Sequence, residues 1–261
     1  MRTATTPWAL GDYDRFAREL FWDIGAELTA ACGAGPGMRV LDVAAGTGNV
    51  ALRAAEAGAD VVASDLTAES LATGELRARE AGLSLDWVVA DAQALPFADN
   101  EFDVVTSSFG AMFAPDHRRA AAELVRVCRP DGRIAVTTWT ADGYAGDLFA
   151  LSSSYVPPRR SPPRPTPVAR RRRVAALFAA AGAEVAITRE RVDFRFGSVP
   201  DAVATYAEQF GPFTGLRAIL RPQGRWEAYL ADFGGLLERY ASPAGDGIAI
   251  RCDYLLITSG A

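Results

Sequence analysis

Lysine is absent from this chain of 261 residues, histidine occurs once, and cysteine occurs three times. Because lysine is missing, chemistry that depends on a lysine Schiff base is excluded. The single histidine, His117, excludes a zinc site built from several histidines. Cys32, Cys128 and Cys252 are far apart and show neither paired metal-ligand spacing nor a disulfide framework. We therefore expect three buried thiols and no metal.

Long uncharged apolar runs are also lacking, and none approaches the roughly 18 residues needed to span a bilayer. The first residues contain no apolar core of a secretory signal, so we expect a cytoplasmic protein without membrane association. A hydrophobic content of 49% is ample for a packed core, and a net charge of −5 argues against wide contact with nucleic acid. These properties predict a soluble globular protein, and they leave its oligomeric state open.

One stretch, residues 39–49, carries an acid where an apolar residue is expected. Residues 40–43 read as a buried strand interrupted by Asp42, and a turn containing Gly46 and Gly48 leads into a helix. A buried ionised carboxylate is costly unless something hydrogen-bonds to it. Asp42 therefore either fixes the turn that follows it or belongs, with the glycines, to a ligand site that the backbone approaches closely.

Strands and helices alternate through the first 140 residues. Apolar runs predict strands at 40–43, 60–65, 85–91, 102–107 and 133–139, and helical patterns predict helices at 12–33, 49–58, 68–82 and 116–128. This alternation is the signature of right-handed βαβ units, so we expect a doubly wound α/β core. Ligands bind such a sheet beyond the carboxyl ends of its strands. The aromatic residues of the first helix are expected to be packing residues; alternatively, the helix leans over the strand ends and places Tyr13 or Phe16 near a ligand.

Later residues have a different character. Residues 141–173 predict a connection rich in proline and arginine that enters a helix near Val168, either a solvated linker or a mobile lid for an anionic substrate. Helix then continues to 181, a strand is predicted at 184–196, two or three helices at 199–240, and a last strand at 248–257. An insertion of that length is too long for a turn, and we expect it to roof the strand-end crevice.

These patterns predict one structural domain with four segments. They are an N-terminal helical segment at 1–37, an α/β core at 38–140, the connection at 141–173, and the completion of the sheet with a helical insertion at 174–261.

Acids close the first three predicted strands. The turn also satisfies the glycine pattern of dinucleotide-binding folds, but a pyrophosphate tolerates the nearby carboxylate of Asp42 poorly. Asp65 ends the second strand, where a carboxylate accepts both hydroxyls of a ribose. Asp91 and Ala92, after the third strand, offer an acceptor for an exocyclic amine and an N–H for a ring nitrogen. These residues favour an adenosine with a cationic tail over a pyrophosphate.

Five ordered motifs resemble those of the class I S-adenosylmethionine-dependent methyltransferases, particularly the small-molecule enzymes of ubiquinone and menaquinone biosynthesis. The motifs lie at 40–48, 64–67, 90–97, 102–105 and 123–132. Two departures stand out. Ala44 replaces a glycine of the family, so we expect its backbone to avoid positive φ. Pro130-Asp131-Gly132 replaces the usual Pro-Gly-Gly, far from the methyl group.

The resemblance implies a seven-stranded, Rossmann-like sheet that is mostly parallel, with its last strand, 248–257, antiparallel. It implies S-adenosylmethionine as cofactor and S-adenosylhomocysteine as product, with Asp42 organising the turn that holds the amino-acid part, Asp65 at the ribose and Asp91 at the adenine. The implied cofactor-binding residues are Asp42, Ala44, Ala45, Gly46, Gly48, Asn49, Asp65, Leu66, Asp91, Ala92, Gln93, Ser108 and Phe109.

A sulfonium methyl group is already activated, so in-line transfer chiefly needs an acceptor held about 3 Å away with water excluded. Where the acceptor needs a base, His117 is the catalytic candidate because its unperturbed pKa lies near 6.5; alternatively it only begins a helix capped by Asp116. The aromatic and long apolar residues of 199–240 favour a small hydrophobic or aromatic acceptor, or else form the core of the insertion.

Other functions stay open from the sequence alone. One is an NAD(P)-dependent oxidoreductase on a similar sheet, and another is a cofactor-binding protein without catalysis. A third is a nucleic-acid methyltransferase that uses the arginines at 159–173, although we expect a small-molecule partner and no nucleic acid. The residues do not distinguish O-, N- or C-methylation.

Overall fold

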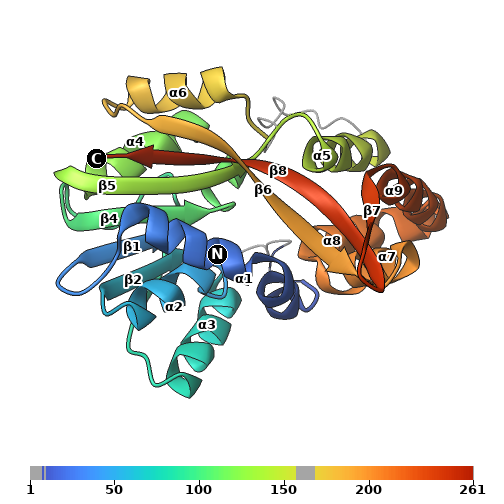
Figure 1. The fold of residues 1–261 in the computed structure, drawn as a ribbon, viewed down its shortest axis with the longest axis horizontal. Helices are drawn as coiled ribbons and strands as arrows, with labels where there is room; N and C mark the ends of the chain where they lie inside the picture. The colour runs from blue at the N-terminus through green and yellow to red at the C-terminus, as the bar shows by residue number, and fades with distance from the viewer. Residues whose placement is uncertain (1–7, 9, 157–167, 261) are drawn as a thin grey trace.

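The computed structural model describes residues 8, 10–156 and 168–260. A single sheet runs through the molecule (Figure 1). Its strands lie in the order β3 (Asp86–Val89), β2 (Asp60–Asp65), β1 (Arg39–Val43), β4 (Phe102–Ser108), β5 (Cys128–Trp139), β8 (Gly247–Ser259) and β6 (Ala186–Phe196). The short strand β7 (Ala241–Ala244) pairs with β8 outside this order. The first five strands are parallel, and β8 is antiparallel to both of its neighbours. The doubly wound sheet with an antiparallel last strand is thus confirmed.

Helices cover both faces of this sheet. α1 (Tyr13–Cys32) and α2 (Asn49–Glu56) share one buried core with Val40, whereas α4 (His117–Val127) and α6 (Arg171–Ala180) share another with Leu41 and Val43. Side chains alternate between the faces of a strand, so a strand buried on both faces reads as a continuous apolar run. Asp42 consequently lies on the same face as Val40, toward α2.

A cluster of helices lies beside the sheet. It consists of α5 (Tyr144–Tyr155), α7 (Val199–Gln209), α8 (Gly211–Leu220) and α9 (Trp226–Tyr240), and Figure 1 shows the long strands β6 and β8 extending from the sheet into it. Its buried aromatic side chains share one core with residues of α1, β5 and β8. Two or three helices were expected between residues 199 and 240, and the three α-helices α7, α8 and α9 lie there. α3 (Ala68–Glu80) follows β2 and contacts both β2 and β3.

Three predicted boundaries were wrong. The connection predicted at 141–173 contains the helix α5, whose Tyr144 and Leu148 are buried in the helical cluster. α6 begins at Arg171 rather than near Val168, and β5 begins at Cys128 rather than at residue 133. Residues 157–167 of the proline- and arginine-rich stretch lie outside the described residues, so neither the linker nor the lid interpretation is tested.

The three cysteines are free and buried, as predicted. Within the described part of the chain, no helix combines the length and apolar character needed to cross a membrane.

Candidate functional site

The order of the strands reverses between β1 and β4, because β1 leads outward to β2 and β4 leads outward to β5. Loops that follow such strands diverge and open a crevice at the carboxyl edge. Here the loops after β1 to β4 line a cavity of about 240 Å³, the strand-end cavity, whose lining includes Gly46, Asp65, Asp91 and Phe109. A smaller pocket, the turn pocket, lies against the β1 turn and includes Asp42.

These two spaces contain nearly all of the cofactor-binding residues predicted from the sequence. The strand-end cavity is lined by Ala44, Gly46, Asp65, Leu66, Asp91, Ala92, Gln93, Ser108 and Phe109, and the turn pocket adds Asp42, Ala45 and Asn49. The exception is Gly48, which lines neither. It precedes α2 with a φ of 86°, and a Cβ there would lie 2.7 Å from an atom of the Trp87 ring.

Asp42 is fully buried and hydrogen-bonded at both oxygens. Its Oδ2 accepts from the backbone N–H of Ala51 in α2 at 3.1 Å, and its Oδ1 accepts from Oγ1 of Thr106, its register partner in β4, at 3.0 Å. Burial, together with a smaller effect of the charge of Asp65, raises the pKa of this carboxyl to about 7. Asp42 therefore fixes the β1 turn against two elements, and it also lines the turn pocket. Its part in a ligand site stays a prediction.

The N–H groups of the β1 turn are largely used within the protein. Gly46 N donates to Oδ2 of Asp65 at 2.9 Å, and Ala45 N donates to the carbonyl of Ser64 at 2.9 Å. Gly48 N donates to the carbonyl of Ala45. A pyrophosphate needs such N–H groups free. The turn therefore favours a ligand without phosphate.

Ala44 adopts a φ of 55°, so the expectation that its backbone avoids positive φ was wrong. The following N–H, that of Ala45, is tied to Ser64 of β2, and the chain must reverse direction within the turn. A non-glycine residue in this left-handed region is strained by about 1 to 2 kcal/mol. Gly110 packs so closely that a Cβ placed on it would lie 2.7 Å from the carbonyl oxygen of Ala44.

Sequence reasoning missed Arg77, which supports the turn from α3. Its Nη1 donates to the carbonyl of Thr47 at 2.8 Å and to Oδ1 of Asn49 at 3.0 Å. Nδ2 of Asn49 donates to the carbonyl of Ala17 in α1 at 2.8 Å. The amide of Asn49 therefore has partners at both ends and positions the turn. No local pattern marks Arg77, because its contacts join residues about 30 positions apart.

At the outer end of the strand-end cavity, Asp91 accepts from the backbone N–H of Gln93 at 2.9 Å and from its Nε2 at 3.0 Å. The Gln93 Oε1 accepts from Asp116 N, which ties the β3 loop to the start of α4. Leu66 also lines this cavity and is 59% exposed, a large apolar side chain beside acids. An apolar surface between hydrogen-bonding groups suits a flat heterocycle.

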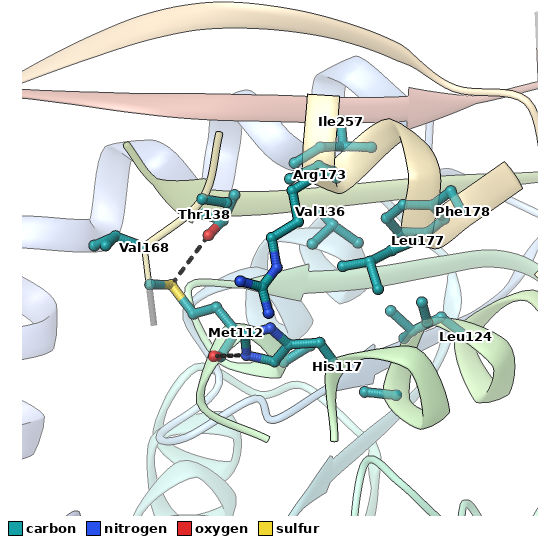
Figure 2. Close-up of a pocket in the computed structure, with 15 residues that line it drawn as sticks. Met112, His117, Leu124, Val136, Thr138, Val168, Arg173, Leu177, Phe178 and Ile257 are labelled. Carbon is teal, nitrogen blue, oxygen red and sulfur yellow. Dashed lines mark hydrogen bonds between the residues drawn. The ribbon is translucent and has the colours of Figure 1, made fainter. Parts of the chain in front are cut away.

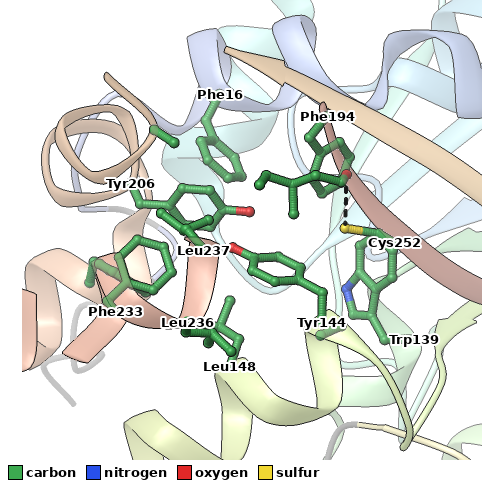
Figure 3. Close-up of a cluster of buried hydrophobic side chains, with 14 of the residues drawn as sticks. Phe16, Trp139, Tyr144, Leu148, Phe194, Tyr206, Phe233, Leu236, Leu237 and Cys252 are labelled. Atoms are coloured by element: carbon green, nitrogen blue, oxygen red, sulfur yellow. Dashed lines mark hydrogen bonds between the residues drawn. The ribbon is translucent and has the colours of Figure 1, made fainter. Parts of the chain in front are cut away.

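A third space, the aromatic cavity, adjoins the strand-end cavity. Its lining includes Tyr13, Phe109, Trp139, Tyr144 and Tyr206, from α1, β5, α5, α7 and the segment after β4. Tyr13 and Phe109 line both cavities. Figure 3 shows Trp139, Tyr144 and Tyr206, from β5, α5 and α7, converging in this region.

The comparisons with known proteins agree with this geometry. The sequence profile of a family described as a methyltransferase domain matches residues 41–136. A solved structure, the YcgJ protein from Bacillus subtilis, superimposes with a TM-score of 0.64 at 19% identity, over 91% of this chain and 97% of that one. Residues 41–136 therefore match a methyltransferase domain, and the chain shares the fold of that solved structure.

Two relatives match this methyltransferase domain in sequence. An uncharacterized protein of Mycobacterium tuberculosis, Rv1405c, is 55% identical over 150 residues, which are 58% of this chain and 55% of that protein. A demethylmenaquinone methyltransferase of Renibacterium salmoninarum is 46% identical over 110 residues, 42% of this chain and 45% of that enzyme. The chain spans about half the length of the curated relatives it matches.

His117 does not reach the strand-end cavity of the methyltransferase domain. Its Nε2 lies 2.7 Å from the carbonyl oxygen of Met112, and it lines a separate cavity between α4 and α6 (Figure 2). The guanidinium of Arg173 points toward it there. Burial lowers the pKa of His117, and the positive charge of Arg173 lowers it further. The general-base role gains no support from this placement.

Asp116, by contrast, caps the N-terminus of α4, as the alternative interpretation of this segment predicted. Its Oδ1 accepts from the backbone N–H groups of Arg118 and Arg119 at 3.0 and 3.1 Å, the arrangement of an N-cap. His117 is the first residue of α4. The position of His117 in the methyltransferase domain is thus that of a helix-entry residue on the far side of the sheet from α2.

Proposed function

We propose that this protein transfers a methyl group from S-adenosylmethionine to a small, hydrophobic or aromatic metabolite. The observation that carries the proposal is the arrangement of two joined cavities at the switch point of the sheet. One is lined by the acids that end β2 and follow β3, and the other is lined by aromatic side chains. The methyltransferase domain supports the reaction class, and the neighbouring helical cluster supports a small acceptor.

The donor set of the strand-end cavity fits the cofactor in three respects. Asp65 ends β2, where its carboxylate suits ribose hydroxyls, and it already accepts two backbone N–H groups. Asp91 follows β3 beside the exposed Leu66, which suits an adenine. The buried carboxyl of Asp42 and the half-buried carboxyl of Asp65 favour a ligand that carries positive charge.

S-adenosylmethionine supplies a methyl group that is already activated on a sulfonium sulfur, ready for in-line displacement. The protein then has to hold the acceptor and exclude water. Tyr13 and Phe109 line both cavities and would contact both ligands. The adjoining Trp139 stacks on Phe109 with ring centroids 3.8 Å apart, which makes this wall rigid.

The aromatic cavity offers orientation and not a base. Its titratable side chains are tyrosines and Cys252. Burial raises the pKa of Tyr144 and of Tyr206 well above 10, and it raises the pKa of Cys252 above 9, so all three are neutral at pH 7. An acceptor therefore has to carry a nucleophile that needs no strong base.

The experiment that tests this function measures methyl transfer directly. S-adenosylmethionine labelled in its methyl group is incubated with the protein and a panel of neutral aromatic amines and thiols, anionic aromatic acids and RNA, and labelled product is separated by chromatography. We expect labelled small aromatic product, and Asp65→Asn should need a higher cofactor concentration to form it. Label found only in RNA would contradict the proposed acceptor class.

A nicotinamide-dependent oxidoreductase is not favoured by any contact in the site. The N–H groups of Gly46, Gly48 and Ala51 all donate to acceptors within the protein, and Asp42 stands beneath the turn where a pyrophosphate would bind. We therefore propose the small-molecule methyltransferase and not an oxidoreductase.

A further inference from the structure

The aromatic cavity has an unusual composition for a space that adjoins a charged site. Every residue that lines it is uncharged, and twelve of the fifteen are phenylalanine, tyrosine or tryptophan, with two tryptophans among them at 8 and 139. A buried ion needs a partner charge or several hydrogen bonds. The cavity offers a carboxylate or phosphate no such partner, so it suits a neutral ligand.

One buried hydroxyl in this space lacks a hydrogen bond of normal geometry. The side chain of Tyr144 is 2% exposed, and its hydroxyl makes no such bond among the described residues, although it interacts with the hydroxyl of Tyr206. Figure 3 shows this hydroxyl and that of Tyr206 pointing toward each other in the middle of the cluster. A buried hydroxyl without such a bond costs free energy, so its retention calls for a ligand or a water that completes it.

Two other tyrosines of the helical cluster, the buried Tyr229 and the half-buried Tyr240, have hydrogen-bond partners. The hydroxyl of Tyr229 lies 2.9 Å from Oγ of Ser152, and that of Tyr240 donates to Oδ2 of Asp147 at 2.8 Å. Neither residue lines the aromatic cavity. Among these tyrosines, the hydroxyl without a hydrogen bond of normal geometry is the one that reaches the cavity.

We infer that the hydroxyl of Tyr144 determines acceptor specificity by hydrogen-bonding a single neutral oxygen, a hydroxyl or carbonyl, on a planar aromatic acceptor held in the aromatic cavity. This inference rests on the proposed function. The ring of the acceptor packs against the walls that Phe109 and Trp139 provide, and its one oxygen reaches Tyr144. Tyr206 lies beside Tyr144, so only a small oxygen-containing group of the acceptor fits next to the Tyr144 hydroxyl.

The position of Tyr144 allows its hydroxyl to contact the acceptor but not the cofactor. It lines the aromatic cavity and neither the strand-end cavity nor the turn pocket. Sites that hydrogen-bond a ligand oxygen reject analogues without it, because the buried protein group is then left unpaired. Tyr144 therefore separates acceptors by their oxygen without changing cofactor affinity.

The test compares three single-ring probes, phenol, benzene and benzoate, by ligand-observed NMR titration of the full chain, with and without S-adenosylhomocysteine. Wild-type protein should bind phenol and benzene and should bind benzoate most weakly. In Tyr144→Phe, the ratio of phenol affinity to benzene affinity should fall about 3- to 10-fold, the loss of one net hydrogen bond. Affinity for S-adenosylhomocysteine should not change.

Tyr229→Phe is the matched control. It removes a buried tyrosine hydroxyl that has a partner, so it should lower the melting temperature and leave the probe ratio unchanged. Tyr144→Phe should lower the melting temperature less than Tyr229→Phe, because the Tyr144 hydroxyl makes no hydrogen bond of normal geometry. An unchanged ratio in Tyr144→Phe, no binding of phenol, or preference for benzoate would overturn the inference.

Failure of the proposed function gives a different result. If S-adenosylhomocysteine does not bind wild-type protein, the methyltransferase proposal is wrong, whatever the probes show. If it binds and the probe ratio does not respond to Tyr144→Phe, only the specificity inference is wrong.

Discussion

Phe109 stacks on Trp139 with ring centroids 3.8 Å apart and an angle of 11° between the ring planes. Phe109 directly follows β4 with a φ of 51°, and its N–H donates to Oγ1 of Thr137 at 3.0 Å. This strained backbone aims the ring between the strand-end cavity and the aromatic cavity. One side chain thus forms a wall of both ligand spaces.

Phe109→Ala should weaken both binding and folding. It removes a buried ring from the stack and should lower the free energy of unfolding by about 3 kcal/mol, and alanine relieves none of the strain at positive φ. Affinity for S-adenosylhomocysteine should fall because the wall of its cavity is lost. The control is Phe178→Ala, which removes a buried ring from α6 far from both cavities. Equal cofactor affinity in Phe109→Ala and wild type would contradict this role.

Gly110→Ala should destabilise the protein by about 1 to 3 kcal/mol, because its Cβ would lie 2.7 Å from the carbonyl oxygen of Ala44. Urea unfolding measures the change. Gly235→Ala is the matched control, since the space beside Gly235 in α9 is open and alanine favours a helix. Gly235→Ala should therefore stabilise slightly. Equal stability of Gly110→Ala and wild type would refute the close packing of Gly110 against Ala44.

Asp65→Asn should weaken the binding of S-adenosylhomocysteine about 10- to 100-fold, the worth of a hydrogen bond to a charged group. Calorimetric titration measures it, and circular dichroism checks that the variant is folded. Asp60→Asn lies at the exposed start of the same strand, so it should bind like wild type. Wild-type affinity in Asp65→Asn would remove this residue from the site.

Asp42 should make stability depend on pH. Its pKa is about 7 in the folded protein and near 3.8 when unfolded, so between these values the folded state holds more protons. Through this group, the free energy of unfolding therefore decreases by at most about 4 kcal/mol as the pH rises from 4 to 7. Asp42→Asn removes that loss, and Oγ1 of Thr106 can accept from the new amide. The stability difference, variant minus wild type, should grow over this range; a constant difference would contradict the buried carboxyl.

Much of the α/β core was predictable because its strands are determined by residues that are close together in the sequence. A parallel strand buried on both faces leaves a continuous apolar run, so β1, β2 and β4 could be recognised within a residue or two. The acids Asp65 and Asp91 stand at strand ends, and strand ends meet at one edge of the sheet. This is why the predicted cofactor residues came together.

Residues placed by tertiary packing were not predictable. His117 follows β4 by only a few positions, but the short helix at Ala111–Phe113 carries the chain across the edge of the sheet, so Phe113 lines the strand-end cavity and His117 faces α6. The α5 sequence carries a serine run, and its helix is decided by burial of Tyr144 and Leu148. The aromatic cavity combines elements from across the chain, which no local pattern reveals.

The most direct measurement is calorimetric titration of the protein with S-adenosylhomocysteine, NADH and NADPH under the same conditions. The carboxylates at the ends of β2 and β3, together with a turn whose N–H groups are already used, predict binding of S-adenosylhomocysteine at one site and no binding of either dinucleotide. Preferential binding of NADH or NADPH would contradict the assignment of this site.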